Sequence, residues 1–82
     1  MMLPTVHLNG TSKGELLQQL CDANSALSAA LRALAEAAPN GRDYYPQGAD
    51  AIGKAITEHT ARLQAIKNVQ KEILAIAEHV DP

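Results

Sequence analysis

The stretch Pro39-Asn40-Gly41-Arg42-Asp43-Tyr44-Tyr45-Pro46-Gln47-Gly48 decides the fold of this chain. Its prolines and glycines interrupt a helical pattern, because proline disfavours helix in the residue before it and glycine favours turns. Long segments with helical periodicity lie on both sides. The stretch also holds both tyrosines of a chain that has no Trp and no Phe. We therefore predict two helices joined by a loop over residues 39–49, and we look for function first in that loop.

Residues 12–38 are predicted to form the first helix. Ser12 and Glu15 have the spacing of a capping box, in which each side chain accepts a hydrogen bond from a free backbone N–H group. Apolar residues then recur at steps of four and three, as in a heptad pattern. The expected buried positions are Leu16, Leu20, Ala23, Leu27, Ala30, Leu34 and Ala37, flanked by Leu17, Leu31, Ala35 and Ala38. Pro39 is expected to end this helix.

Residues 50–80 are predicted to form the second helix, with Asp50 at its start. The pattern of steps of four and three continues here. The expected buried positions are Ile52, Ile56, His59, Leu63, Ile66, Gln70, Ile73, Ala77 and Val80, flanked by Val69, Leu74 and Ile76. Lys54, Glu58 and Arg62 alternate in charge four residues apart, which is typical of a solvent-exposed helix face.

Residues 1–11 are predicted to form an extended arm. Pro4 disfavours helix, the segment from Thr5 to Leu8 alternates polar and apolar residues, and Asn9-Gly10 is a turn pair. We expect Val6 and Leu8 to lie against the helices. The predicted fold class is therefore all-α: an antiparallel two-helix hairpin with a short extended N-terminal arm, in a single domain over residues 1–82.

Such a hairpin is expected to assemble with copies of itself. Two helices cannot surround one another, so their broad apolar faces stay in contact with water. A chain of 82 residues also buries a smaller share of its surface than a typical domain. We therefore predict a homo-oligomeric helical bundle, of which a four-helix dimer is the simplest form. Antiparallel pairing of two hairpins brings the arm of one chain beside the loop of the other.

Charge and cysteine content weigh against several classes of protein. The net charge is −2 and no basic run is present, so nucleic acid is an unlikely partner. The single cysteine, Cys21, cannot form an internal disulfide; we expect it to be buried, and we expect the chain to work in the cytoplasm. No segment approaches the ~20 apolar residues of a membrane span, and the first residues do not resemble a signal peptide. We expect a soluble protein with no membrane partner.

Catalytic and metal-binding patterns are absent from the sequence. There is no carboxylate pair, no nucleophile with a neighbouring base, no glycine-rich phosphate loop in the required context and no cluster of His or Cys at metal-ligand spacing. We therefore expect that the protein is not an enzyme and that it binds neither a metal ion nor a cofactor.

The loop holds the strongest candidates for ligand binding, namely Arg42, Asp43, Tyr44 and Tyr45. Tyrosine rings can stack on a base and the arginine fork can pair with a phosphate, which favours a nucleotide-like ligand. His7, Asn9 and Thr11 of the arm and His59 of the second helix are further candidates, since antiparallel pairing would let them line pockets between subunits. One alternative is that the tyrosines only cover the end of the bundle.

The three histidines differ in their expected roles. His59 at a core position is more often a satisfied polar residue that fixes helix register than an acid or base, and Gln70 is interpreted in the same way. His7 belongs to the arm. His79 is expected to be exposed and without a role.

Two polar motifs carry a resemblance to a known family. His7-Leu8-Asn9-Gly10-Thr11-Ser12 precedes the first helix, and Asn40-Gly41-Arg42-Asp43-Tyr44-Tyr45-Pro46-Gln47-Gly48 separates the two helices. With Glu58-His59 and Arg62-Leu63, they make the chain resemble, from about residue 6 to residue 80, a family of small helical proteins encoded by tailed phages and prophages. The resemblance implies a phage accessory protein in the cytoplasm of the bacterial host and assigns no activity.

Three functional hypotheses follow. Small helical-hairpin phage proteins include oligomeric sponges that sequester the nucleotide signals of host anti-phage defence, and this chain is similar to them in architecture and size. The first hypothesis is therefore a ligand-sequestering homo-oligomer. The alternative is a structural or adaptor protein of the virion or its assembly, which holds a protein partner. A nucleic-acid-binding regulator is disfavoured, because the chain is acidic.

Overall fold

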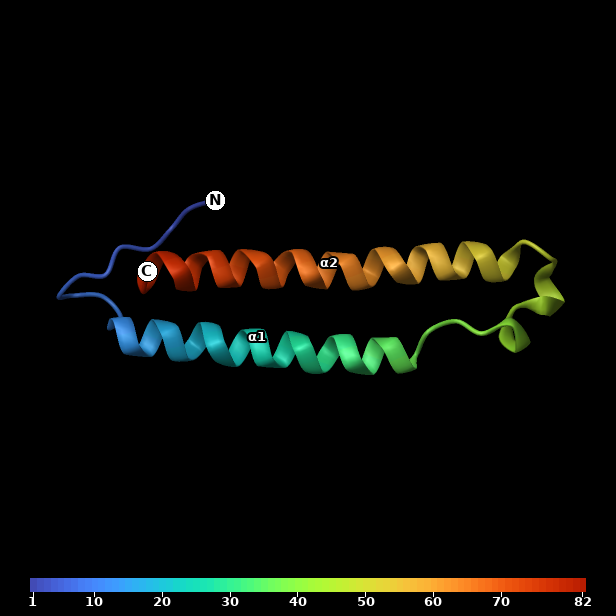
Figure 1. Cartoon of the computed structure of the whole chain (residues 1–82), viewed down its shortest axis with the longest axis horizontal. Helices are drawn as coiled ribbons and strands as arrows, with labels where there is room; N and C mark the ends of the chain where they lie inside the picture. Colours follow the sequence, from blue (N-terminus) through green and yellow to red (C-terminus); the bar gives the residue numbers. More distant parts are fainter.

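The computed structural model describes all residues, 1–82, and contains only helices and the segments that connect them. Helix α1 spans Lys13–Glu36 and helix α2 spans Ala51–Val80, with two short 3-10 helices, η1 (Gly41–Asp43) and η2 (Tyr45–Gln47), between them. Figure 1 shows α1 and α2 side by side and running in opposite directions, in a rod with extents of 61 × 21 × 19 Å. The prediction of an all-helical chain built on a pair of packed long helices is confirmed.

Helix α1 begins at a capped end. The Ser12 hydroxyl accepts a hydrogen bond from the Glu15 N–H at 3.2 Å, whereas the Glu15 carboxylate makes no bond back to Ser12, so half of the predicted capping box forms. The helix ends at Glu36, before Pro39. Its last turn tightens, because the Ala37 N–H bonds to the carbonyl groups of both Ala33 and Leu34.

Helix α2 begins without a side-chain cap. Asp50 lies in the residue before the helix in a helical conformation, and its carboxylate accepts no capping bond. Asp50 therefore stands at the start of α2 as predicted, and its carbonyl accepts the first bond of this helix, from the Lys54 N–H at 3.2 Å. At the far end, an ion pair of 2.9 Å between Lys13 and Asp81 joins the start of α1 to the residue after α2.

The contact between α1 and α2 is made by their leucine-rich and isoleucine-rich sides. The half-buried residues of α1 are Leu16, Leu17, Leu20, Asn24, Leu27, Ser28, Ala30, Leu31 and Leu34. Those of α2 are Ala51, Ile52, Ala55, Leu63, Ile66, Gln70, Ile73, Ile76 and Ala77, together with the buried His59 and Val80. The prediction is wrong at Ala23 and Ala37, which are exposed, and at Ile56, which is 48% exposed. The contact stripe of α1 is turned toward its larger side chains, because burying leucine removes more apolar area from water than burying alanine.

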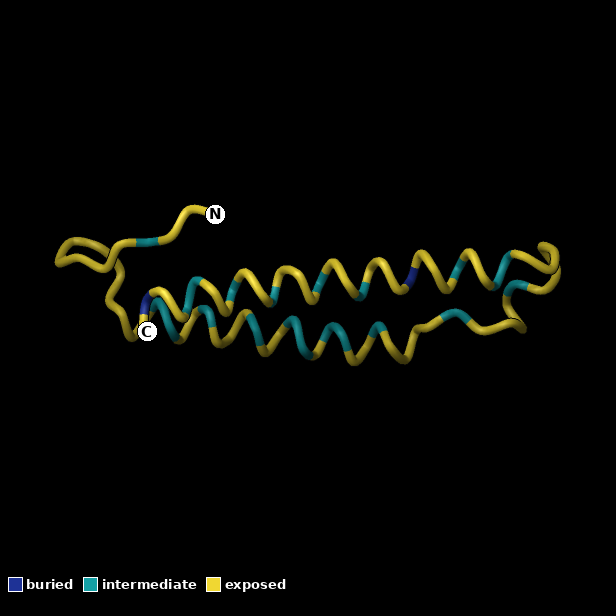
Figure 2. Tube along the Cα trace, turned by 45° about the horizontal axis from the view of Figure 1, so that its top comes forward, coloured by how far each residue is buried: buried dark blue, intermediate teal, exposed yellow.

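The helix pair does not enclose a core. His59 and Val80 are the only buried residues, and the contact sides of both helices are intermediate in exposure along their whole length (Figure 2). Exposed apolar side chains include Val69 and Leu74 of α2 and most of the large residues of the arm. Cys21 is exposed, so the prediction that it is buried is wrong. A single chain therefore leaves much of its apolar surface in water.

The N-terminal arm folds back beside the C-terminal part of α2 (Figure 1). It is held there by a hydrogen bond of 3.0 Å that the His79 ring nitrogen Nε2 donates to the Pro4 carbonyl. His79 is exposed as predicted, but it has a role that the sequence did not reveal. The expectation that Val6 and Leu8 lie against the helices is wrong, since Leu8 is 97% exposed and Val6 is exposed too.

Candidate functional site

His59 connects α2 to the last turn of α1. Its ring nitrogen Nε2 lies 2.7 Å from the Leu34 carbonyl oxygen and donates to it, since a carbonyl can only accept. The ring is 7% exposed. The Leu34 carbonyl also accepts from the Ala37 N–H at 3.1 Å, so His59 supplies a second donor to an oxygen that the contact between the helices covers. His59 thus has the environment of a polar core residue, with the nitrogen that reaches α1 already bonded.

Gln70 makes a second polar connection between the helices. Its amide nitrogen donates to the Ser28 hydroxyl at 2.9 Å and to the Asn24 carbonyl at 3.4 Å. The side-chain oxygen of Asn24 is buried there without a hydrogen-bond partner. A polar layer within an otherwise apolar contact fixes the register of two helices, because any shift leaves its members unsatisfied.

Asn40 shapes the loop between the helices. Its side-chain oxygen accepts a hydrogen bond from the Arg42 N–H at 3.0 Å, and its amide nitrogen donates to the Asp43 carboxylate at 3.0 Å. These bonds organise η1. After η2, Gly48 adopts a φ of 115°, which L-residues with a side chain rarely take, and turns the chain toward α2. The loop residues Asn40, Asp43 and Gly48 therefore position the segment that carries Tyr44.

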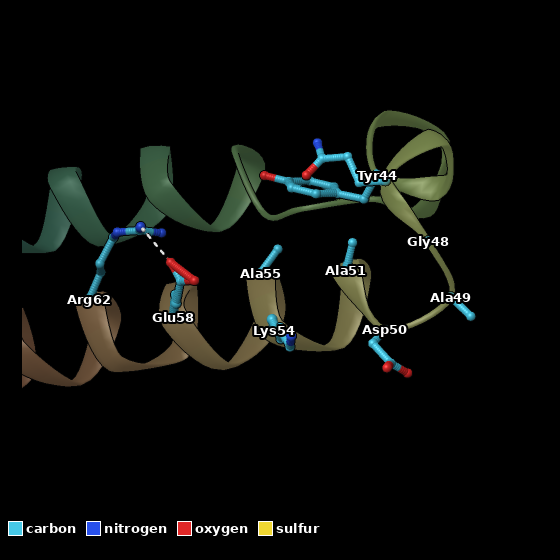
Figure 3. Close-up of a pocket in the computed structure, with 10 residues that line it drawn as sticks. Tyr44, Gly48, Ala49, Asp50, Ala51, Lys54, Ala55, Glu58 and Arg62 are labelled. Carbon is cyan, nitrogen blue, oxygen red and sulfur yellow. Dashed lines mark ion pairs between the residues drawn. The ribbon is translucent and has the colours of Figure 1, made fainter.

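A hollow of about 460 Å³ lies where this loop meets the first turns of α2 (Figure 3). The Tyr44 ring lies on the loop side of the hollow, and α2 forms the opposite side (Figure 3). The lining residues are Tyr44, Gln47, Gly48, Ala49, Asp50, Ala51, Lys54, Ala55, Glu58 and Arg62. The residues around the hollow thus include an aromatic ring, two cationic residues and the carboxylate of Glu58, while the Asp50 carboxylate points away from Tyr44 (Figure 3).

The charges around the hollow are only weakly paired. Arg62 lies 3.7 Å from the Glu58 carboxylate, and both side chains are exposed. Lys54 makes no ion pair, since the pairs Lys13–Asp81 and Arg62–Glu58 are the only ones in the chain. An exposed pair of this length contributes little to stability, so Arg62 can exchange its partner at low cost. Lys54 and Arg62 are therefore available to an anionic group beside the Tyr44 ring.

The structure separates the predicted binding residues into three groups. Tyr44 lines the hollow, whereas Arg42, Asp43 and Tyr45 are not among its lining residues, and Tyr45 is 77% exposed. His7, Asn9 and Thr11 lie at the opposite end of the rod, where the arm meets α1 (Figure 1). His59 lies in the contact between the helices. Within one chain, these residues do not form one site.

Sequence reasoning missed most of the residues that join Tyr44. The spacing of Lys54, Glu58 and Arg62 indicates only an exposed row of alternating charges, and no pattern in the sequence marks Gln47 as a lining residue. Their four-residue spacing does place them on one side of α2, which is the signal that could have found them. That the Tyr44 ring faces this side depends on the path of the loop, which spacing does not give.

Comparison of the chain with known protein families, with curated proteins and with solved structures gave no match. Neither α1 nor α2 is both long enough and apolar enough to span a membrane. No three His, Cys, Asp or Glu side chains gather closely enough to hold a metal ion.

Proposed function

We propose that this protein is a non-enzymatic phage or prophage accessory protein that assembles into a homo-oligomer and sequesters a small nucleotide-like ligand in the bacterial cytoplasm. The ligand would bind in the hollow at Tyr44. One observation carries this proposal: the Tyr44 ring shares a hollow with Lys54 and Arg62. A ring that can stack on a base, beside cations that can bind a phosphate, is the combination that nucleotide recognition requires.

The volume of the hollow is suited to a small-molecule ligand. Its volume of about 460 Å³ falls within the range of ~300–1,000 Å³ that is usual for small-molecule sites. Glu58 adds an acceptor for a hydroxyl or amino group of a ligand. The resemblance of the loop motif to the phage family supports the biological setting.

The burial of the chain supports self-assembly. Apart from Val80, no apolar residue is buried, although α1 carries a long row of Leu and α2 a long row of Ile and Leu. Packing against further copies would cover these rows and make the two-helix unit part of a closed bundle. The sites of ligand binding would then lie close to the boundaries between subunits.

Thermal unfolding tests whether the protein binds a nucleotide-like ligand. The protein is heated with cyclic dinucleotides, with ADP-ribose derivatives or with inorganic phosphate, and its melting temperature is followed. A ligand at 100 times its Kd contributes about 2.7 kcal/mol of stability, which raises the melting temperature by several degrees. We expect such a rise with at least one nucleotide and none with phosphate alone at the same concentration.

The two tyrosines supply a matched control. Tyr44→Ala should abolish the rise, because it removes the ring from the hollow, whereas Tyr45→Ala should keep it, because that side chain points into solvent. Lys54→Gln should weaken the rise and Lys71→Gln should not, since Lys71 is not part of the lining. The proposal fails if no nucleotide stabilises the protein, or if the two tyrosine variants respond alike.

A structural or adaptor protein is the second candidate. It is favoured by the arm, where Met1, Met2 and Leu8 are large, apolar and exposed. Such side chains are typical of a surface that holds a protein partner. This hypothesis predicts that changing Met2 and Leu8 to Ser breaks a protein complex in a pull-down and leaves the thermal response to nucleotides untouched.

A further inference from the structure

One flank of α2 has the composition of a surface that can pack against the same surface of a second copy of the chain. This paired flank consists of residues at alternating steps of four and three, which therefore share one side of the helix. Its members are Ala51, Ala55, Glu58, Arg62, Ala65, Val69, Glu72 and Ile76. The first four line the hollow at Tyr44, and the flank continues from there toward the C-terminal end of α2.

The part of the paired flank beyond the hollow is apolar but carries an unpaired charge. Val69 is 43% exposed, and Ala65 is exposed beside it. Glu72 makes no ion pair, and Arg62 has only the 3.7 Å contact with Glu58. An exposed valine between a free carboxylate and a weakly held guanidinium leaves both apolar and electrostatic stabilisation to be gained from a partner.

We propose that two copies of the chain pair antiparallel along this flank, with Arg62 of each copy opposite the partner's Glu72. The inference rests on the proposed homo-oligomer and deepens it by naming the surface. The same arrangement sets Ala65 opposite the partner's Val69, because both pairs are centred on the level of Lys67. The small Ala65 leaves room for the larger side chain. Two-fold symmetry makes every contact occur twice.

The order of charges along the paired flank disfavours two other arrangements. A parallel pairing in register places Arg62 opposite the partner's Arg62, and Glu72 opposite the partner's Glu72. An antiparallel pairing centred on Ala65 places Glu58 opposite the partner's Glu72. Both bring like charges together, which is unfavourable. The pairing centred on Lys67 joins opposite charges at both ends of its apolar middle.

The dimensions of the rod allow a stable contact of this kind. Stable interfaces bury about 1,600 Å² in total, or about 800 Å² on each partner. The long axis of the molecule measures 61 Å, so a second rod lying along it has the length needed for such a contact. On the paired flank, Val69, Ile76 and the three alanines would supply the apolar part of this area.

This pairing would complete the hollow at Tyr44 with the arm of the second copy. Lys54 and the partner's Val80 are equally far from the centre at Lys67, about 20 Å at ~1.5 Å per residue. The end of the partner helix therefore reaches the level of the hollow. Figure 1 shows that the arm turns just beyond the end of α2, so the partner's His7, Asn9 and Thr11 would lie at the mouth of the hollow.

Charge reversal tests the pairing. Arg62→Glu and Glu72→Arg are each expected to raise the dissociation constant of the oligomer about tenfold or more, because each puts like charges opposite one another at two places. The double variant restores both pairs with inverted polarity and should return to within a few-fold of the unchanged chain. Sedimentation equilibrium without ligand measures the constant, and circular dichroism checks that each variant keeps its helices.

Lys71→Glu is the matched control, since it reverses a charge next to Glu72 but outside the paired flank. Its effect on the dissociation constant should stay within a few-fold. The pairing is wrong if the single reversals have no more effect than this control, or if the double variant is as weak as the singles. The thermal response of Glu72→Arg to nucleotides remains a separate measurement, because Glu72 does not line the hollow. A monomer at micromolar concentration would overturn the homo-oligomer itself.

Discussion

The His59 ring donates a hydrogen bond of 2.7 Å to the carbonyl of Leu34, across the contact between α1 and α2. The same carbonyl accepts from the Ala37 N–H at 3.1 Å, in the turn where α1 ends. The bond thus ties the last turn of α1 to a fixed level of α2. That level sets where the loop begins and, through the loop, where Tyr44 meets α2.

Removal of this bond should destabilise the chain. His59→Ala is expected to lower the free energy of unfolding by about 1–3 kcal/mol, because it leaves a covered carbonyl without one of its partners and removes the packing of a buried ring. Urea unfolding followed by circular dichroism at fixed protein concentration measures the loss. His59→Gln, which keeps an N–H donor, should lose less.

His79→Ala is the control for that measurement. Its bond to the Pro4 carbonyl is exposed, so its loss should change the free energy of unfolding by no more than ~0.5 kcal/mol. Equal losses for His59→Ala and His79→Ala would show that the bond to Leu34 is not a structural tie.

Replacing Gly48 or Gly53 by alanine should change the free energy of unfolding in opposite directions. Gly48 has a φ of 115°, so Gly48→Ala is expected to cost about 1–3 kcal/mol and to disturb the hollow that it lines. Gly53 lies inside α2, and an added Cβ there meets nothing within 4 Å, so Gly53→Ala should gain about 1 kcal/mol. Melting temperatures of the two variants under one buffer condition suffice. A gain for Gly48→Ala would contradict the positive φ at Gly48, and a loss for Gly53→Ala would show that the added Cβ is not tolerated there.

Gln70 should affect which helix register and assembly form more than it affects the free energy of unfolding. Gln70→Leu removes the bonds to Ser28 and Asn24 but adds an apolar side chain to the contact, so the free energy of unfolding should stay equal or rise. We expect the variant to form a mixture of assemblies in sedimentation velocity, because the polar layer no longer fixes the register. A single, unchanged species would show that other contacts set the register.

The pattern of apolar residues predicted the elements of the fold but not the side by which they meet. Steps of four and three located both helices, and Ser12 marked the start of the first one. The pattern put Ala23 in the contact, where the structure has Asn24. A helix with a heptad pattern can rotate about its axis by one residue position when the residues on both sides of the apolar stripe are apolar or small. Packing against the partner helix then decides which residues are in the contact.

The candidate site could be predicted only in part. Tyr44 was found because aromatic residues are rare in this chain and both lie in the loop. Its neighbour Tyr45 is marked by the same rarity of aromatic residues, but its side chain is exposed to solvent. Which tyrosine faces α2 depends on the backbone of η1 and η2, where single dihedral angles reverse the direction of a side chain.

The sequence by itself determined that this chain forms two long helices with a break at the loop, since propensity and periodicity act over neighbouring residues. Only the tertiary structure decided that Tyr44 shares a hollow with Lys54 and Arg62, that His59 reaches Leu34 and that the arm lies beside α2. The physical reason is that these contacts join segments distant along the chain. Their geometry follows from the angle and register at which the two helices pack, and no local preference encodes that register.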